Sequence, residues 1–277
     1  MPSVTGNRFQ PWLDLWDLVP DGEAFTTEYT ASWLLPVRRR GAPAMLKLAA
    51  VPEEIAGGAL MEWWDGEGAA QVLARQGEAL LLERATGDRS LLDMSRGGED
   101  DAATQIICDA VEVLHRPRAK PLPAALTPLD VWFKALAPAA AAHGGVLVEA
   151  HRAAQALLSD PRDVVPLHGD VHHANILDFG ERGWLAIDPK CVIGERGYDY
   201  ANPFCNPDTA TALKPGRLDR YLELVSRRAT IEPRRLLMWI LAYSGLSAAW
   251  YLEDGQEAKF DLSIVELAAA ALAQTSV

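Results

Sequence analysis

Residues 167–190 read LHGDVHHANILDFGERGWLAIDPK, and this stretch concentrates the candidate functional side chains of the chain. Three histidines and one aspartate fall within six residues, namely His168, Asp170, His172 and His173. The preceding VVPL segment is typical of a strand that enters a turn, and Gly169 interrupts any helix that would align the imidazoles. The residues alone leave two chemistries open here: a transition-metal site, or a loop in which only some side chains act.

A second interpretation follows from the spacing His168-x-Asp170-x-x-x-x-Asn175, which is that of kinase catalytic loops. Residues 176–179 predict a short strand, 180–183 a turn, and 184–187 a second strand that ends at Asp188. Such a hairpin would place Asn175 and Asp188 at the same end of neighbouring strands. Their oxygens could hold Mg²⁺, which prefers hard oxygen ligands, while Asp170 would accept a proton from a substrate hydroxyl.

On this interpretation the histidines are not part of the core chemistry, and a role of His172 and His173 near the acceptor stays open. His168 would pack behind the loop, His172 and His173 would be exposed loop residues, and Asp178 would be a solvated turn carboxylate. A histidine-rich zinc site needs side chains that converge on one ion, which a turn does not provide predictably. A metal-dependent hydrolase and a non-catalytic nucleotide-binding module are therefore kept as alternatives to phosphoryl transfer.

The composition narrows the class of protein. The 277 residues carry a formal net charge of −12, which disfavours a nucleic-acid partner and suits a small cationic ligand. The three cysteines are far apart and imply no disulfide framework. Neither a signal peptide nor an apolar run of membrane-spanning length is visible. We expect a cytoplasmic, monomeric protein with no membrane or nucleic-acid partner.

The pattern along the chain predicts two lobes. A hairpin of Ser32–Val37 and Ala44–Leu48 around RRRGAP, a helix over 53–64 and a strand at Ala79–Glu83 make a mixed N-terminal lobe, residues 1–84. The C-terminal lobe, residues 85–277, is mainly helical, with a hinge at about 83–88. Its expected elements are helices at Asp100–His115, Leu129–Ala142, Val146–Leu158 and within 215–275, and a strand-rich insert at 163–188. Ligands often bind between such lobes.

Several motifs together resemble the aminoglycoside phosphotransferase family, and more narrowly its streptomycin 6-kinase, or aminoglycoside/hydroxyurea resistance kinase, branch. They are HGDVHHANIL, IDPK, 194-GERGYDYANPFCNP-207, SWLLPVRRRGAPAMLKLA, WWDGEGAAQVLA and LLMWILAYSGLSAAWYLEDG. The resemblance implies an α+β, two-lobed protein-kinase-like fold. It also implies ATP- and Mg²⁺-dependent transfer of the γ-phosphate to an aminoglycoside, with the streptomycin 6-hydroxyl as the expected acceptor and antibiotic resistance as the result. Another small-molecule hydroxyl is the alternative acceptor.

The resemblance also implies residue roles. Asp170 matches the catalytic base, Asn175 and Asp188 match the Mg²⁺ ligands, and Asp199 matches a structural aspartate that braces the catalytic loop. The remaining implied positions bind nucleotide: Lys47 on the α/β-phosphates, the loop 29–32 with Thr30 and Ser32 over the phosphates, and Glu83 to Ala85 at the adenine hinge.

The chain departs from the family pattern at several positions. The phosphate loop lacks GxGxxG, and Gly57 stands where many relatives carry the glutamate that pairs with the strand lysine. Glu54 and Glu53 are the substitutes that lie about one turn earlier. Lys190 stands where some close relatives have histidine. Carboxylates that could bind the guanidinium groups of streptomycin are Asp208, Glu253 and Asp254.

Overall fold

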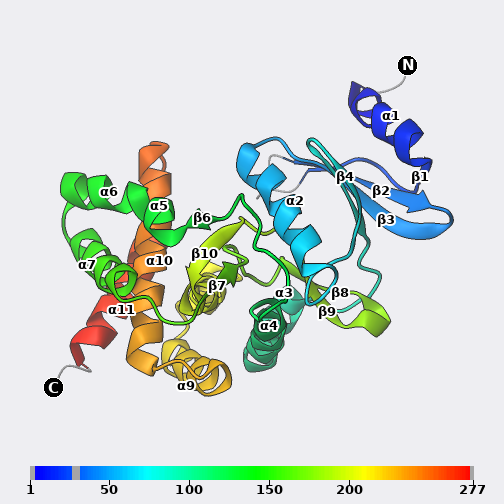
Figure 1. The fold of residues 1–277 in the computed structure, drawn as a ribbon. Coiled ribbons are helices and arrows are strands. Elements are labelled where there is room, and N and C mark those ends of the chain that lie inside the picture. The colour runs from blue at the N-terminus through cyan, green and yellow to red at the C-terminus, as the bar shows by residue number, and fades with distance from the viewer. Residues whose placement is uncertain (1–3, 27–31, 275–277) are drawn as a thin grey trace.

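The computed structural model describes residues 4–26 and 32–274, which form a small sheet-based lobe and a larger helical lobe (Figure 1). The small lobe contains one antiparallel sheet in the order β1-β2-β3-β5-β4. Its strands are β1 (Leu18–Pro20), β2 (Trp33–Arg39), β3 (Ala42–Leu48), β4 (Val72–Gln76) and β5 (Ala79–Glu83). The two-lobed α+β fold is confirmed, whereas the boundary between residues 84 and 85 stays a prediction.

The predicted hairpin forms between β2 and β3, and its turn is shorter than the RRRGAP segment suggested. Arg40 and Gly41 both have positive φ, 52° and 83°, as a two-residue turn of the type I′ class requires. Arg38 and Arg39 therefore continue β2, paired with Pro43 and Ala42. The register that follows pairs Leu34 with Lys47, which fixes where the lysine lies along the strand.

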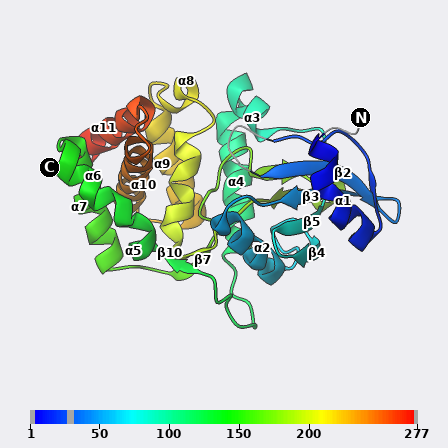
Figure 2. The same ribbon diagram turned by 90° about the horizontal axis from the view of Figure 1, so that it is seen from above.

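The side chain of Lys47 in β3 points away from the hydrophobic core of the small lobe. Ala44, Leu46 and Leu48 pack in a cluster with Phe9 of α1 (Val4–Trp16), which covers one face of the sheet (Figure 2). Because successive side chains of a strand point to opposite faces, Met45 and Lys47 lie on the other face. That face is covered by α2 (Pro52–Trp64) and turns toward the large lobe.

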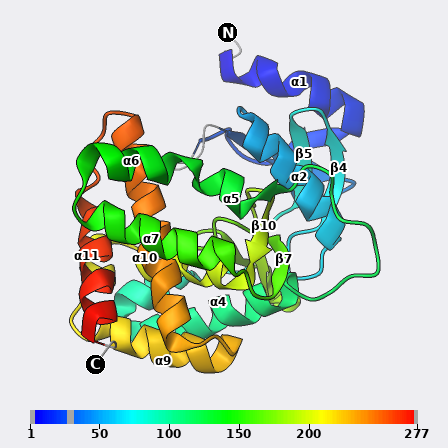
Figure 3. The same ribbon diagram turned by 60° about the vertical axis from the view of Figure 1, so that its left-hand side comes forward.

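The large lobe is built on long helices, of which α7, α10 and α11 lie side by side (Figure 3). Its helices are α3 (Leu91–Met94), α4 (Asp100–Leu114), α5 (Leu129–Trp132), α6 (Leu136–His143), α7 (Val146–Ser159), α8 (Thr209–Ala212), α9 (Arg217–Ala229), α10 (Pro233–Glu253) and α11 (Lys259–Gln274). Its strands are β6 (Thr127–Pro128), β7 (Val164–Leu167), β8 (Ile176–Asp178), β9 (Trp184–Ala186) and β10 (Val192–Glu195). Among the described residues, no helix is long and apolar enough to cross a membrane.

Most predicted helices are confirmed, but the single helix expected over Leu129–Ala142 is wrong. The chain instead forms α5, a 3-10 turn over Phe133–Ala135, and then α6. Pro138 gives the physical reason, because proline lacks an N–H and is best accommodated in the first turn of a helix. A new helix that begins at Leu136 places Pro138 in that first turn.

Gly57 allows α2 to approach the segment after β9 backbone to backbone. A Cβ at position 57 would lie 2.1 Å from the carbonyl oxygen of Pro189, a distance that real Cβ contacts do not reach. From the sequence alone, this glycine is expected to destabilise the helix by about 1 kcal/mol relative to alanine. In the structure it permits the close approach that holds α2 next to Asp188.

We predict that Gly57→Ala destabilises the protein although alanine is the better helix former. The methyl group must push α2 away from Pro189, and such overpacking costs about 1–3 kcal/mol. Urea denaturation measures the change in the free energy of unfolding. Gly97→Ala is the matched control, since a Cβ there meets open space. An unchanged midpoint for Gly57→Ala would contradict the close packing.

Candidate active site

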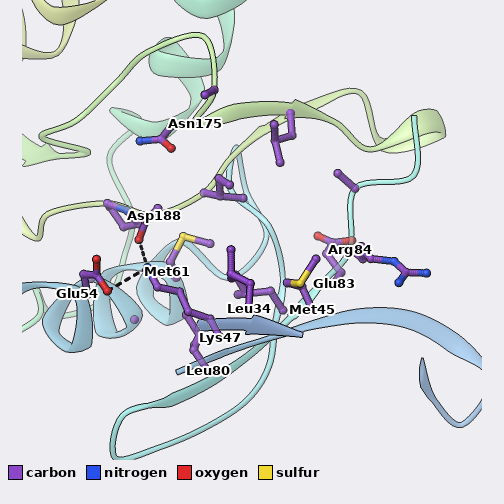
Figure 4. Close-up of a pocket in the computed structure, with 18 of the residues that line it drawn as sticks. Leu34, Met45, Lys47, Glu54, Met61, Leu80, Glu83, Arg84, Asn175 and Asp188 are labelled. Atoms are coloured by element: carbon purple, nitrogen blue, oxygen red, sulfur yellow. Dashed lines mark hydrogen bonds and ion pairs between the residues drawn. The ribbon is translucent and has the colours of Figure 1, made fainter. Parts of the chain in front are cut away.

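A cavity of about 560 Å³ lies between the sheet of the small lobe and the β8–β9 hairpin of the large lobe (Figure 4). Seven of the predicted site residues line it: Lys47, Glu54, Glu83, Ala85, Asp170, Asn175 and Asp188. Much of the remaining lining is apolar and comes from both lobes, namely Leu34, Met45, Met61, Leu80, Leu82, Leu177, Phe179 and Ile187. The cavity therefore joins an apolar slot to a charged end.

Lys47 lies at the charged end, between two carboxylates from different elements. Its Nζ forms an ion pair with Asp188 Oδ1 and lies 3.6 Å from Glu54 Oε2 on α2, as the dashed lines in Figure 4 mark. Lys47 and Glu54 are both buried, whereas Glu53 is exposed. Of the two candidate partners from the sequence, Glu54 is the one that the helix turns toward the lysine.

Ser32 makes a different contact from the phosphate contact that the family resemblance implied. The residue is fully buried, and its hydroxyl donates a hydrogen bond to Glu54 Oε2. Ser32 thereby helps to hold the glutamate that pairs with Lys47. Thr30, the other predicted phosphate-loop residue, lies outside the described residues.

The β8–β9 hairpin brings Asn175 and Asp188 together as the sequence predicts. Ile176 pairs with Ala186, and the Ile187 N–H donates to the Asn175 carbonyl at 2.9 Å. The side-chain amide nitrogen of Asn175 donates to the backbone carbonyl of Asp170 at 2.9 Å. This bond leaves the amide oxygen of Asn175 as the atom with which the side chain can bind a cation.

The charge of Asp188 is set by competition between burial and nearby cations. Burial raises the pKa of the Asp188 carboxyl, but the field and hydrogen bond of Lys47, with further help from Lys190, outweigh it and hold the pKa below its ordinary value. The carboxylate is therefore charged at neutral pH. Its backbone has a φ of 61°, a conformation that places the end of the hairpin beside Lys47.

The Asp170 carboxylate is held from two sides. Asn202 donates its amide N–H to Oδ1 at 3.0 Å, and Lys190 Nζ lies 3.5 Å from Oδ2. Asn202 is itself ordered, because its side-chain oxygen accepts a hydrogen bond from Asn206 at 3.0 Å. The sequence analysis did not assign Asn202, although this residue lies within the quoted GYDYANPFCNP segment.

Asp199 fixes the backbone of the Asp170 loop. Its carboxylate accepts hydrogen bonds from the N–H groups of His168 and Gly169, both at 2.8 Å, and contacts His115 Nε2 at 2.8 Å. His168 is fully buried, contacts the Ile187 carbonyl through Nε2, and accepts the Asp170 N–H at Nδ1. These contacts agree with the scaffold roles predicted for both residues.

Two predictions of solvent exposure are wrong, one for the histidines of the loop and one for Asp178 at the end of β8. His173 was expected to be exposed but is buried, and neither of its ring nitrogens has a hydrogen-bond partner; His172 is half-buried and lines the cavity. Asp178 was expected to be a solvated turn carboxylate. It is buried and forms an ion pair with Arg89 at 2.7 Å, because the turn folds back onto the segment after β5.

These contacts also argue against a histidine metal centre. Both ring nitrogens of His168 already have backbone partners, Nε2 at the Ile187 carbonyl and Nδ1 at the Asp170 N–H. Within residues 4–26 and 32–274, no group of three His, Cys, Asp or Glu side chains is placed to hold a metal ion. A Mg²⁺ site that uses Asn175, Asp188 and the phosphates of a bound ligand needs no such group.

Glu83 lies at the opposite end of the cavity from Asp188 (Figure 4), and Ala85 also lines the cavity. The Glu83 carboxylate accepts a hydrogen bond from the Gln71 N–H at 2.6 Å and forms an ion pair with Arg182 in the β8–β9 turn. Arg182 also donates to the Gly66 carbonyl at 2.7 Å. The segment that joins the lobes is thus fastened to the hairpin that carries Asn175 and Asp188.

The three carboxylates predicted to bind the acceptor are not among the residues that line this cavity. Asp208 caps α8 by accepting the Thr211 N–H at 2.9 Å, and it forms an ion pair with Arg96 at 2.8 Å. Glu253 and Asp254 are exposed at the C-terminal end of α10. A role for any of them in binding the acceptor stays a prediction.

Comparison with known proteins identifies the family. Residues 15–255 match the aminoglycoside/hydroxyurea antibiotic resistance kinase family. The chain belongs to this family. It is 50% identical to a streptomycin 3″-kinase of Klebsiella pneumoniae, over 88% of this chain and 92% of that protein. It is 29% identical to a streptomycin 6-kinase of Streptomyces griseus, over 88% of this chain and 81% of that protein.

The kinase fold is also found among solved structures. The crystal structure of aminoglycoside phosphotransferase APH(4)-Ia aligns with a TM-score of 0.68 over 99% of this chain and all of that one. Sequence identity is only 14%, so this likeness concerns the fold. It confirms that the kinase described above has the protein-kinase-like architecture expected from its sequence.

We predict that two neighbouring glutamates of this kinase differ in importance. Glu54→Gln removes the charge that faces Lys47 and should lower the affinity for ADP about tenfold, the effect of one charge-assisted contact of about 1.5 kcal/mol. Glu53→Gln is the matched control, because Glu53 is exposed. Isothermal titration with ADP measures both variants. Equal affinities in the two would show that Glu54 does not order Lys47.

Proposed function

We propose that this kinase transfers the γ-phosphate of ATP to a hydroxyl of streptomycin. The observation that carries the proposal is the convergence of Lys47, Asp170, Asn175 and Asp188 at one end of a single cavity. A cation for phosphates, a base and two oxygen ligands for a metal are what phosphoryl transfer needs, since that reaction depends mostly on positioning and charge neutralisation.

The cavity suits a nucleotide. Its apolar slot has room for a flat base between side chains of the sheet, such as Leu34 and Leu82, and side chains of the hairpin, such as Leu177. Lys47 would hold the phosphates at the other end. Asn175 and Asp188 would hold Mg²⁺, which would neutralise charge on the phosphate oxygens.

Asp170 would act on the acceptor. Its carboxylate accepts the proton of the attacking hydroxyl as the new bond between oxygen and phosphorus forms and the bond to ADP breaks. ADP keeps the bridging oxygen, and the acceptor oxygen carries the phosphoryl group. The hydrogen bond from Asn202 to Oδ1 fixes the rotamer of Asp170, so that the carboxylate is oriented before the acceptor binds.

Two observations support streptomycin as the acceptor. The relative with 50% identity is a streptomycin kinase, and the net charge of −12 favours a cationic ligand. The relatives are named for kinase activity at two different positions of streptomycin, 3″ and 6. The proposal therefore stops at streptomycin, and the 6-hydroxyl expected from the sequence stays a prediction. Resistance to the antibiotic would be the consequence.

The proposed active unit is a monomer, as expected from the sequence. The proposed place of action is the cytoplasm, because the reaction consumes ATP. Neither point affects the chemistry at Asp170. Light scattering measures the oligomeric state, and cell fractionation measures the location.

We predict that the purified protein releases ADP when given Mg-ATP and streptomycin, and that Asp170→Asn lowers kcat by about 10²–10⁴-fold. The amide cannot accept the acceptor's proton but keeps the shape of the side chain. Coupled ADP detection gives the rates. Phosphorus NMR of the product gives the hydroxyl that is modified.

The control for this experiment is ADP affinity, which Asp170→Asn should leave unchanged. Turnover of choline or a simple sugar in place of streptomycin would contradict the acceptor while supporting the phosphotransferase. Full activity in Asp170→Asn would contradict the role of the base.

We predict that Asp188→Asn weakens the dependence of ADP binding on Mg²⁺. The amide removes the charge that would bind the metal, so affinity for Mg²⁺ in the ADP complex should fall at least tenfold, roughly the smallest loss that even an outer-shell change causes. ADP titrations at several Mg²⁺ concentrations measure this. Glu181→Gln, an exposed carboxylate in the same hairpin turn, is the control, and equal Mg²⁺ dependence in both variants would refute the metal site.

A further inference from the structure

Lys190 is a second cation at the charged end of the site, and the mechanism above does not use it. Its Nζ lies 3.5 Å from Asp170 Oδ2, and its side chain is 24% exposed. Asn202 holds the other oxygen of the same carboxylate. The lysine and the amide therefore approach Asp170 at its two oxygens.

The backbone fixes the place of Lys190 beside the catalytic loop. Its N–H donates to the His168 carbonyl at 2.7 Å. A Cβ at Gly169 would lie 3.1 Å from Lys190 Cβ and 2.7 Å from Val192, and Gly169 has a φ of 81°. A glycine at 169 therefore lets the chain that carries Lys190 lie against the loop that carries Asp170.

Lys190 is surrounded by acidic side chains. Its Nζ lies 3.5 Å from Asp170 Oδ2, and the charges of Asp188 and Glu54 also act on it. An ammonium group among three carboxylates is attracted to each of them. Its direct contact is with Asp170, whose charge changes if the carboxylate accepts a proton.

Lys190 and Lys47 lie differently with respect to the cavity. Lys47 lines it, together with the groups that would hold nucleotide phosphates, whereas Lys190 is not among the lining residues. Both nevertheless lie close to the carboxylates of the charged end, Lys47 at Asp188 and Lys190 at Asp170. Lys190 therefore reaches the charged end through Asp170, the residue proposed to act on the acceptor.

We propose that Lys190 is a further catalytic residue, which binds the phosphoryl group from the acceptor side as it leaves the nucleotide. This inference rests on the proposed function. In the free enzyme Lys190 pairs with Asp170. When Asp170 accepts the proton of the hydroxyl, the carboxylate loses its charge and its hold on the ammonium group. Lys190 is then available to the phosphoryl oxygens, while the new oxygen–phosphorus bond forms and ADP departs.

The flexible stem and compact charge of lysine suit such a movement. The interaction would be made in the transition state and not with bound ATP. Binding that exists only in the transition state raises kcat without lowering KM. Lys190 therefore has a kinetic signature distinct from that of Lys47, whose loss would weaken nucleotide binding.

The test compares Lys190→Met with Lys190→Arg in the full-length protein. We expect Lys190→Met to lower kcat at least about 100-fold, the usual effect of removing one transition-state contact, with KM for ATP and streptomycin unchanged. Lys190→Arg should restore part of kcat. Binding of ADP with aluminium fluoride and streptomycin, which mimics the transition state, should weaken in Lys190→Met, whereas binding of ADP alone should not.

Lys120→Met is the matched control, because Lys120 is exposed and outside the cavity. The proposal is overturned if Lys190→Met keeps the wild-type kcat, or if it loses affinity for ADP and for the transition-state mimic equally, which a structural role would produce. Absence of streptomycin turnover by the wild type would instead contradict the proposed function.

Discussion

The site depends on one buried cation shared by three structural elements. Lys47 comes from the central strand of the small sheet, Glu54 from the helix that covers it, and Asp188 from a hairpin of the other lobe. Buried charges are costly unless they are paired, so the lysine requires both lobes to present their carboxylates. The glycine at position 57 makes this geometry possible, because it lets the helix lie directly on Pro189.

Two aspartates have different proposed roles because their surroundings differ. Lys47 stabilises the charged form of Asp188, which suits this carboxylate to bind a metal ion. Asp170 is held by Asn202 and Lys190, and on the proposed mechanism it faces the acceptor hydroxyl. The backbone of the Asp170 loop is anchored by Asp199, which accepts hydrogen bonds from the N–H groups of His168 and Gly169. Rigid support of this kind is what a reaction governed by positioning needs.

Local patterns in the sequence predicted the hairpin of residues 176–187, since two short apolar runs flank a turn with a glycine at each end. They also predicted the strand that carries Lys47. They failed where the outcome depended on distant neighbours. His173 looked like a loop residue, and Asp178 looked like a turn carboxylate, but other parts of the chain cover the first and Arg89 pairs with the second.

The sequence by itself determined the lobes, the kinase-like spacing of Asp170 and Asn175, and the family, because these follow from periodicity and from short motifs. Only the tertiary structure decided that Glu54 and not Glu53 faces Lys47, and that Lys190 reaches Asp170. Lys190 and Asp170 are separated along the chain. Glu53 and Glu54 are adjacent, and the rotation of the helix decides which of them faces the lysine. Their geometry is fixed by how α2, the hairpin and the catalytic loop pack together, which no local pattern encodes.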